Sequence, residues 1–247
     1  AAAACPLDVW LFLWARPGDA GLAARVGAAR PLLRGLKIHA SLEGVPLDDR
    51  RWDEVFALAA AEDLALMVHT GRWQQAAGYG LALDRAAAWP NVTFILSHAG
   101  GDTPELCTGA ASAVQQRRLD NVCFDTAGLR EGWALVRAMR TAGPERYLMG
   151  SDFPLAHPAM YVAQMETLPV PDVWKEGLLG GNARRVLGAP APRQLAGVGG
   201  GATTHPPGRT TEPEPTPTPV PGPVTKREPP STISDAAETI LITGAGG

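Results

Sequence analysis

A strand–turn–helix rhythm that repeats from Leu7 to Leu187 constrains the fold of this chain more than any other feature. Six short apolar runs each end in a polar or glycine-rich turn, and stretches with helical periodicity lie between them. The runs are Val9–Ala15, Leu36–His39, Leu64–His69, Val92–His98, Val122–Thr126 and Tyr147–Asp152. Strands that are apolar on both faces are typical of a buried parallel sheet. We therefore expect an α/β fold.

The segments between these runs have the patterns of amphipathic helices. Asp48 and Asp49 can cap a helix whose apolar side chains recur at i, i+3, i+4 and i+7 from Trp52 to Ala59. Further helices are predicted at Leu81–Trp89, Thr103–Arg118 and Glu131–Arg140. Strands that alternate with helices in this way build either a closed barrel or an open doubly wound sheet.

The length of the repeating unit favours the barrel. Successive strand ends, at His69, His98, Asp125 and Asp152, are 29, 27 and 27 residues apart. A (β/α)8 TIM barrel needs eight such units and about 250 residues, whereas only six are visible within residues 1–188. We expect an incomplete TIM barrel with strands 3–8 present and two units upstream of a start that has no Met. An open doubly wound sheet that binds a small ligand without metal is the alternative.

The remainder of the chain has a different composition. More than half of the 23 prolines lie between Pro190 and Pro230, which predicts a disordered Pro/Gly-rich linker over residues 189–235. Residues 236–247 end in ILITGAGG, an opening strand followed by glycines. This resembles the start of a Rossmann-like domain of the NAD-dependent epimerase/dehydratase group, in which Gly244 and Gly246 would approach NAD(P). A frayed tail is the alternative.

Composition excludes several classes of protein. A formal net charge of -3 gives no reason to expect a nucleic-acid partner, and no apolar run reaches the roughly 18 residues that span a bilayer. The three cysteines are widely spaced and include no CxxC pair, which disfavours a disulfide framework. We expect a cytoplasmic protein that acts on a small molecule and can form a homo-oligomer.

Polar side chains follow several of the predicted strands. His69 and His98 stand at equivalent strand ends one unit apart, and Asp152 follows the last strand. Imidazole and carboxylate are good ligands for a divalent ion such as zinc. For a single residue a structural role is the simpler explanation: a hydrogen-bonded histidine at His39, or a turn at Asp125 or Asp152. His69 and His98 together weaken that explanation.

Six motifs carry a family resemblance. In chain order they are GLKIHASLEG from Gly35, MVHTG from Met67, NVTFILSHAGG from Asn91, NVCFDTAG from Asn121, YLMGSDFP from Tyr147 and GGNARRVLG from Gly180. Together they resemble the amidohydrolase-related family of metal-dependent hydrolases, in the branch that includes aminocarboxymuconate semialdehyde decarboxylase. The resemblance covers about Leu7 to Gly188 and implies the barrel argued above.

The resemblance implies roles for individual residues. His69 matches a metal-binding histidine, and His98 matches an active-site histidine that contacts substrate or the activated water. Asp152 matches an aspartate that binds metal and handles the proton. Asn182 and Arg184 match a C-terminal helix, where we expect Asn182 to act as a helix cap.

One family feature is absent from this chain. The family's first strand carries a His-x-His pair of metal ligands, and no His-x-His occurs here. Truncation explains the missing strands and the missing ligands together, so we expect the 247-residue chain to be inactive alone. Arg72, Trp73 and His39 are candidate substrate-binding residues, because they stand beside predicted strand ends.

The predicted function is metal-dependent hydrolysis of a C–O or C–N bond, or decarboxylation, of a small carboxylate-bearing or cyclic substrate. In this prediction zinc is the first candidate for the metal. The alternative is a non-catalytic barrel that serves as a scaffold or binding module for a fused NAD-dependent epimerase or reductase. The residues alone do not distinguish hydrolysis from decarboxylation.

Overall fold

The computed structural model of the chain describes residues 9–71, 74–188 and 239–243. Six parallel strands pair in chain order, and a seventh pairs antiparallel with the first, giving the order β6-β5-β4-β3-β2-β1-β7. The strands are β1 Val9–Trp14, β2 Leu33–Ile38, β3 Ala65–Val68, β4 Phe94–Leu96, β5 Val122–Asp125, β6 Tyr147–Leu148 and β7 Thr239–Thr243. This parallel α/β sheet confirms the predicted fold class and is consistent with part of a TIM barrel.

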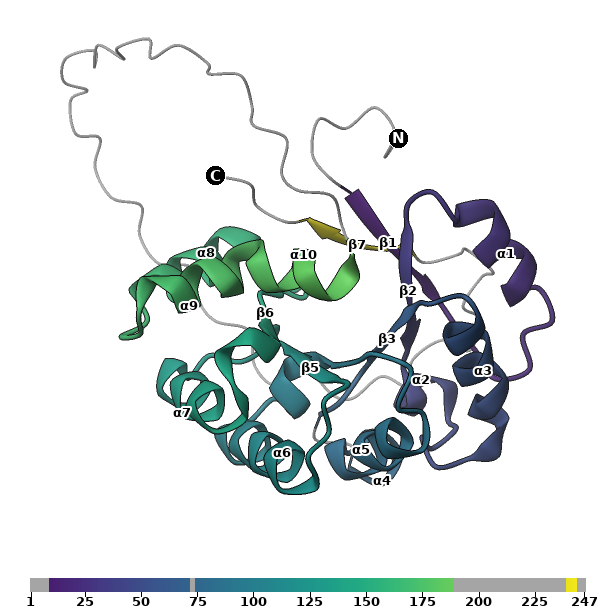
Figure 1. The fold of residues 1–247 in the computed structure, drawn as a ribbon, viewed down its shortest axis with the longest axis horizontal. Helices are drawn as coiled ribbons and strands as arrows, with labels where there is room; N and C mark the ends of the chain where they lie inside the picture. Colours follow the sequence, from purple (N-terminus) through teal and green to yellow (C-terminus); the bar gives the residue numbers. More distant parts are fainter. Residues whose placement is uncertain (1–8, 72–73, 189–238, 244–247) are drawn as a thin grey trace, which may run out of the picture. The chain divides into compact units, whose positions relative to one another are not determined.

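Helices follow the strands and surround the curved sheet, and the last of them packs against its inner face (Figure 1). The helices are α1 Leu22–Ala29, α2 Ala40–Glu43, α3 Asp53–Ala61, α4 Gln74–Ala77, α5 Tyr79–Ala88, α6 Pro104–Arg117, α7 Gly132–Ala142, α8 Pro158–Thr167, α9 Asp172–Glu176 and α10 Asn182–Leu187. Thr103 caps α6 through its side chain, and Asp49 caps the short turn Arg50–Trp52 before α3. The four helices predicted between the strands are thus present.

Apolar side chains pack on both faces of the sheet. The larger cluster joins the sheet to the outer helices and contains Trp52, Phe56 and Phe94, which are fully buried. The smaller cluster covers the inner face, where strand residues such as Phe12 and Met67 pack with side chains of α10. Burial on both faces explains why the strands read as continuous apolar runs rather than alternating ones.

Strand boundaries differ from the prediction where other groups take over the backbone hydrogen bonds. The run Tyr147–Asp152 forms only the two-residue strand β6, because the amide of Met149 donates to the carbonyl of Leu178 at 3.1 Å. The next glycine, Gly150, donates its amide to the hydroxyl of Thr126 at 3.1 Å. Both bonds turn the chain out of the sheet, so that the following residues form a loop.

The expected role of Asn182 is wrong. Asn182 is the first helical residue of α10 rather than its cap, and the capping position is Gly181, which has no side chain to offer. The amide Nδ2 of Asn182 instead donates to the carbonyls of Pro144 and Tyr147, at 2.9 and 2.8 Å. The side chain therefore ties α10 to the start of β6.

The strand predicted in the last residues of the chain is present as β7. It pairs antiparallel with β1, from Val9 opposite Thr243 to Leu13 opposite Thr239. Gly244, Gly246 and the proline-rich segment lie outside the described residues, so the dinucleotide-binding domain stays a prediction. No helix in the described part of the chain has both the length and the apolar character needed to cross a membrane.

Candidate active site

Chemistry-bearing side chains gather at the carboxyl edge of the sheet. His39 follows β2, His69 follows β3, His98 lies in the turn after β4, Asp125 ends β5 and Asp152 lies four residues beyond β6. Because these strands are parallel, their carboxyl ends lie along one edge. The sequence-based expectation that these residues arrive at the same end of the sheet is therefore met.

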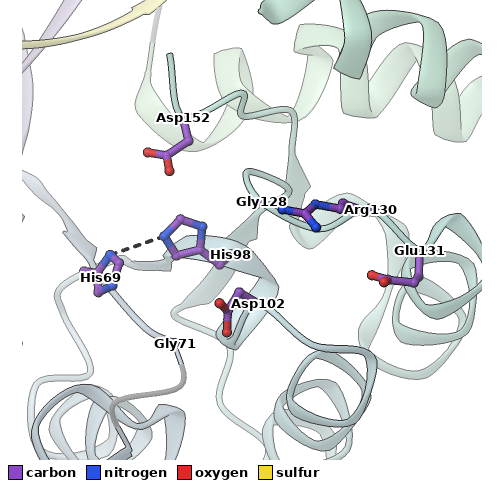
Figure 2. A pocket seen from close by; sticks show the side chains of 8 residues that line it. All are labelled: His69, Gly71, His98, Asp102, Gly128, Arg130, Glu131 and Asp152. Carbon is purple, nitrogen blue, oxygen red and sulfur yellow. Dashed lines mark hydrogen bonds between the residues drawn. The ribbon is translucent and has the colours of Figure 1, made fainter. Parts of the chain in front are cut away.

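A cleft of about 310 Å³ opens at this edge (Figure 2). Its lining combines imidazoles, carboxylates, glycines and one guanidinium group. The lining residues are His69, Gly71, His98, Asp102, Gly128, Arg130, Glu131 and Asp152. Three of them were predicted site residues. The other five were not singled out, although they stand in the loops that follow the strand ends, and that position is the signal that could have found them.

His98 is held in an unusual backbone conformation. His98 and Ala99 both adopt left-handed φ values, 58° and 54°. Such conformations are costly for residues other than glycine and persist only where the surroundings hold them. Asp125 supplies that constraint, because its Oδ1 accepts hydrogen bonds from the amides of His98 and Ala127, both at 3.0 Å. The buried Asp125 is thus a loop organiser, as its turn interpretation anticipated.

The hydrogen bonds of His98 determine where protons sit on two imidazoles. The carbonyl of Ala127 can only accept, so the His98 Nδ1 at 2.9 Å must carry the proton of that bond. In neutral His98 the Nε2 is then an acceptor, and His69 Nδ1, 3.2 Å away, donates to it. This chain leaves Nε2 of His69 unprotonated, with a lone pair that is available to a metal or a proton.

The surroundings of His69 keep its ring neutral. Burial, reinforced by the nearby His39 and Lys37, lowers the pKa of His69 to about 2. The His39 ring stacks on the His69 ring, with centroids 3.7 Å apart and planes 13° apart. Neutral imidazole is the form that ligates metals, so the burial of His69 is compatible with a ligand role.

His39 supports His69 and does not line the cleft. Its Nδ1 accepts the amide of Leu42 at 3.3 Å, which caps α2, and Trp14 lies on its other side with ring centroids 5.8 Å apart. Burial lowers the pKa of His39 to about 4. Contact between His39 and a substrate stays a prediction, as do the roles of Arg72 and Trp73, which lie outside the described residues.

A buried lysine lies beneath the same edge. Lys37 is only 7% exposed, and its Nζ donates to Oγ of Ser97 at 2.8 Å. Burial lowers the pKa of Lys37, while the charges of Asp125 and Asp152 oppose that shift. Lys37 is thus a buried lysine that bonds the hydroxyl of the residue before His98.

Asp152 reaches the cleft from the loop after β6. Its backbone has a left-handed φ of 57°, and its carbonyl accepts the amide of Leu155 at 2.9 Å in a tight turn. The carboxylate lies on the side of the cleft facing the two imidazoles (Figure 2). An exposed carboxylate at this place can bind a cation or exchange a proton with a bound molecule.

The donor set fits part of a metal site. His69 Nε2 and the Asp152 carboxylate are suitable in chemistry for a divalent ion. However, the described residues contain no group of three or more His, Cys, Asp or Glu side chains that could hold a metal ion together. Since zinc takes at least three protein ligands in most sites, these two donors make up only part of a set.

Comparison with known proteins decides the family. The model of a family described as Amidohydrolase matches residues 2–189, about three quarters of the chain. The chain belongs to the amidohydrolase family. The chain has no match among curated protein sequences.

Solved structures share its fold at low sequence identity. A 5-carboxyvanillate decarboxylase of Sphingomonas paucimobilis is 21% identical with a TM-score of 0.57, over 72% of this chain and 66% of that one. An amidohydrolase of Burkholderia multivorans with bound zinc is 20% identical with a TM-score of 0.59, over 72% and 73%. A 5-carboxyvanillate decarboxylase of Novosphingobium aromaticivorans with bound manganese is 16% identical with a TM-score of 0.57, over 72% and 64%. The chain thus spans less than two thirds of the length of both decarboxylases.

Proposed function

We propose that this chain contributes His69, His98 and Asp152 to the active site of a metal-dependent hydrolase or decarboxylase that acts on a small molecule. The observation that carries the proposal is the hydrogen-bond chain from Ala127 through His98 to His69. It leaves an imidazole lone pair beside a cleft that the Asp152 carboxylate also lines. Family membership supports the reaction class, and the bound zinc and manganese of two similar structures support a divalent metal.

In this proposal His69 Nε2 and Asp152 hold the metal, together with donors from outside the described residues. A divalent ion there would polarise a substrate oxygen or lower the pKa of a water to about 7. His98 keeps His69 in the ligating tautomer, because His98 Nε2 accepts the proton on His69 Nδ1. Asp152 accepts the proton released during the reaction and returns it to the leaving group.

Hydrolysis and decarboxylation use the same three residues differently. In hydrolysis Asp152 removes a proton from the attacking water. In decarboxylation Asp152 takes up a proton from solvent and delivers it to the carbon that keeps the electron pair of the C–C bond as carbon dioxide leaves. The cleft of about 310 Å³ is at the lower end of small-molecule sites, which suits a single-ring or short-chain substrate. The similarity to two decarboxylases is the reason for proposing decarboxylation as the alternative to hydrolysis.

A zinc titration of metal-free protein tests the metal assignment without depending on turnover. We expect weak binding by the 247-residue chain and at least a tenfold loss of zinc affinity in His69→Ala and in Asp152→Asn. The control is Asp172→Asn, since Asp172 is exposed on α9, where it pairs with Lys175 at 3.5 Å. If wild type and the three variants bind zinc with equal affinity, His69 and Asp152 are not metal ligands.

Activity tests the proton-transfer role of Asp152 in the intact protein. We expect Asp152→Asn to lose at least a hundredfold in turnover with an unchanged circular dichroism spectrum. Assays of lactones and esters, and of carbon dioxide release from aromatic acids, separate the two reactions. Near-full turnover by this variant would contradict the role of Asp152, whereas the absence of turnover by the intact wild-type protein in both assays would favour the scaffold alternative. The cytoplasmic location and the homo-oligomeric state stay predictions from the sequence.

A further inference from the structure

The loop that follows β5 brings an arginine into the cleft. Arg130 lines the cleft, and its guanidinium is turned towards the side where His98 lies (Figure 2). Within the described residues no hydrogen bond or ion pair engages this guanidinium. Arginine presents five donors in a rigid fork, so an arginine whose fork is unoccupied in a cleft is a candidate for binding a ligand.

The backbone of this loop is held at several points. The Gly128 amide donates to the hydroxyl of Tyr161 at 2.8 Å, and the side chain of Leu129 is buried. The side-chain amide of Gln164 donates to the carbonyl of Arg130 at 3.0 Å. Two residues of α8 therefore fix the segment that carries the arginine, so that binding would not need to order the loop.

The same loop passes directly over an active-site imidazole. Gly128 has a φ of 73°, and a Cβ at this position would lie 2.9 Å from Nδ1 of His98. Only glycine satisfies both conditions, the left-handed backbone and the close approach. The position of Arg130, two residues further on, is thus tied to the position of His98.

The charges of the cleft indicate which kind of ligand group Arg130 would bind. Among the lining residues that the structure describes, Asp102, Glu131 and Asp152 are acidic, and Arg130 is the one guanidinium or ammonium. The carboxylates of Glu131 and Asp152 repel an anion, so among the described lining residues Arg130 is the group that favours one. A planar, singly charged carboxylate matches the guanidinium fork in two parallel hydrogen bonds, while a dianionic phosphate would meet stronger repulsion.

We infer that Arg130 recognises a carboxylate group of the substrate and orients it towards His98 and Asp152. This inference rests on the proposed function and gives it a substrate class: small organic acids that carry a carboxylate. Tyr161 and Gln164 are positioning residues, because they act on the ligand only through the backbone of the Arg130 loop. The candidate from the sequence, Arg72, lies outside the described residues and plays no part in this argument.

The test compares benzoate with its neutral analogue benzamide on the full 247-residue chain, by ligand-observed NMR titration. We expect Arg130→Gln to weaken benzoate binding at least tenfold and to change benzamide binding less than twofold. Arg130→Lys should fall between wild type and Arg130→Gln, because it keeps the charge and loses the fork. Arg137→Gln, on the exposed side of α7, is the matched control and should bind both probes like wild type.

A positioning variant adds a second readout. Gln164→Ala should weaken benzoate binding about three- to tenfold and leave benzamide binding unchanged. Equal losses of both probes in Arg130→Gln would indicate structural damage and overturn the inference. So would wild-type protein that does not bind benzoate at 20 mM, or that binds inorganic phosphate more tightly than benzoate.

The zinc titration separates this inference from the proposed function. Arg130→Gln should keep the zinc affinity of wild type, because its side chain is not a metal donor. If zinc affinity proves independent of His69 and Asp152 while benzoate binding depends on Arg130, the metal assignment fails and the carboxylate site stands. If zinc affinity depends on His69 and Asp152 while benzoate binding does not depend on Arg130, the carboxylate site is refuted and the metal assignment stands.

Discussion

The buried carboxylate of Asp125 should contribute strongly to stability, because it is the acceptor for two amides. Its Oδ1 lies 3.0 Å from the amide nitrogens of His98 and of Ala127, and Asp125 is 7% exposed. In Asp125→Ala both amides lose their acceptor. A buried polar group without a partner costs about 1–3 kcal/mol, so the free energy of unfolding should fall by about 2–6 kcal/mol.

Urea unfolding followed by tryptophan fluorescence measures this loss. With a urea dependence of about 2 kcal/mol per molar, the midpoint of Asp125→Ala should fall by about 1–3 M. Asp125→Asn keeps an acceptor oxygen in the same place and should lose at most about half as much. Asp120→Ala is the control: Asp120 is 99% exposed and pairs with Arg146 at 3.3 Å, an interaction worth about 0–1 kcal/mol.

The relative stabilities of the two Asp125 variants show which interaction of this carboxylate provides the stability. An Asp125→Asn protein as unstable as Asp125→Ala would show that the negative charge, and not the two amide bonds, provides the stability. An Asp125→Ala protein as stable as wild type would show that the left-handed turn at His98 holds without this carboxylate. Either result would refute the inference that the two amide hydrogen bonds to Asp125 hold this loop.

Two further predictions follow from packing and burial. Gly35→Ala should destabilise the protein by about 3 kcal/mol or more in thermal unfolding, because the added Cβ would lie 2.2 Å from Phe12 Cε1 and 2.5 Å from the Ala65 carbonyl oxygen. The control is Gly27→Ala, whose Cβ would have nothing within 4 Å and which should be neutral or stabilising by about 1 kcal/mol. Equal effects of the two substitutions on stability would contradict this packing. The pKa of His39 is lowered by burial from 6.5 to about 4, so the unfolded chain binds its proton first and the stability of metal-free protein should fall as the pH drops from about 6.5 to 4. His39→Asn should flatten this dependence by up to about 1.4 kcal/mol per pH unit, and an unchanged slope in urea titrations would exclude His39 as its source.

Strand ends were the most predictable part of this molecule. Polar residues follow the apolar segments of β3, β4 and β6, so the sequence alone could place His69, His98 and Asp152 near one edge of the sheet. The limits of β6 could not be predicted, because they depend on a hydrogen bond from Met149 to the distant Leu178. Such competition between partners leaves no local pattern.

The loops of the site were predicted less well than its strand ends. Arg130 has no periodicity or motif that marks it, and its place in the cleft depends on contacts with Tyr161 and Gln164 on a helix that comes later in the chain. Asn182 looked like a helix cap, yet its amide reaches carbonyls some 35 residues away. In both cases long-range contacts override what the neighbouring residues suggest.

The inner face of the sheet has a consequence for synthesis of the protein. Strand residues from β1 onward, such as Phe12, stay uncovered on that face until Ala183 and Leu187 of α10 have been made. About 170 residues separate β1 from the end of α10, which at about 5–20 residues per second takes roughly 10–35 s on the ribosome. During that interval the nascent chain presents an apolar surface, and a holding chaperone that binds extended apolar segments should protect it from aggregation.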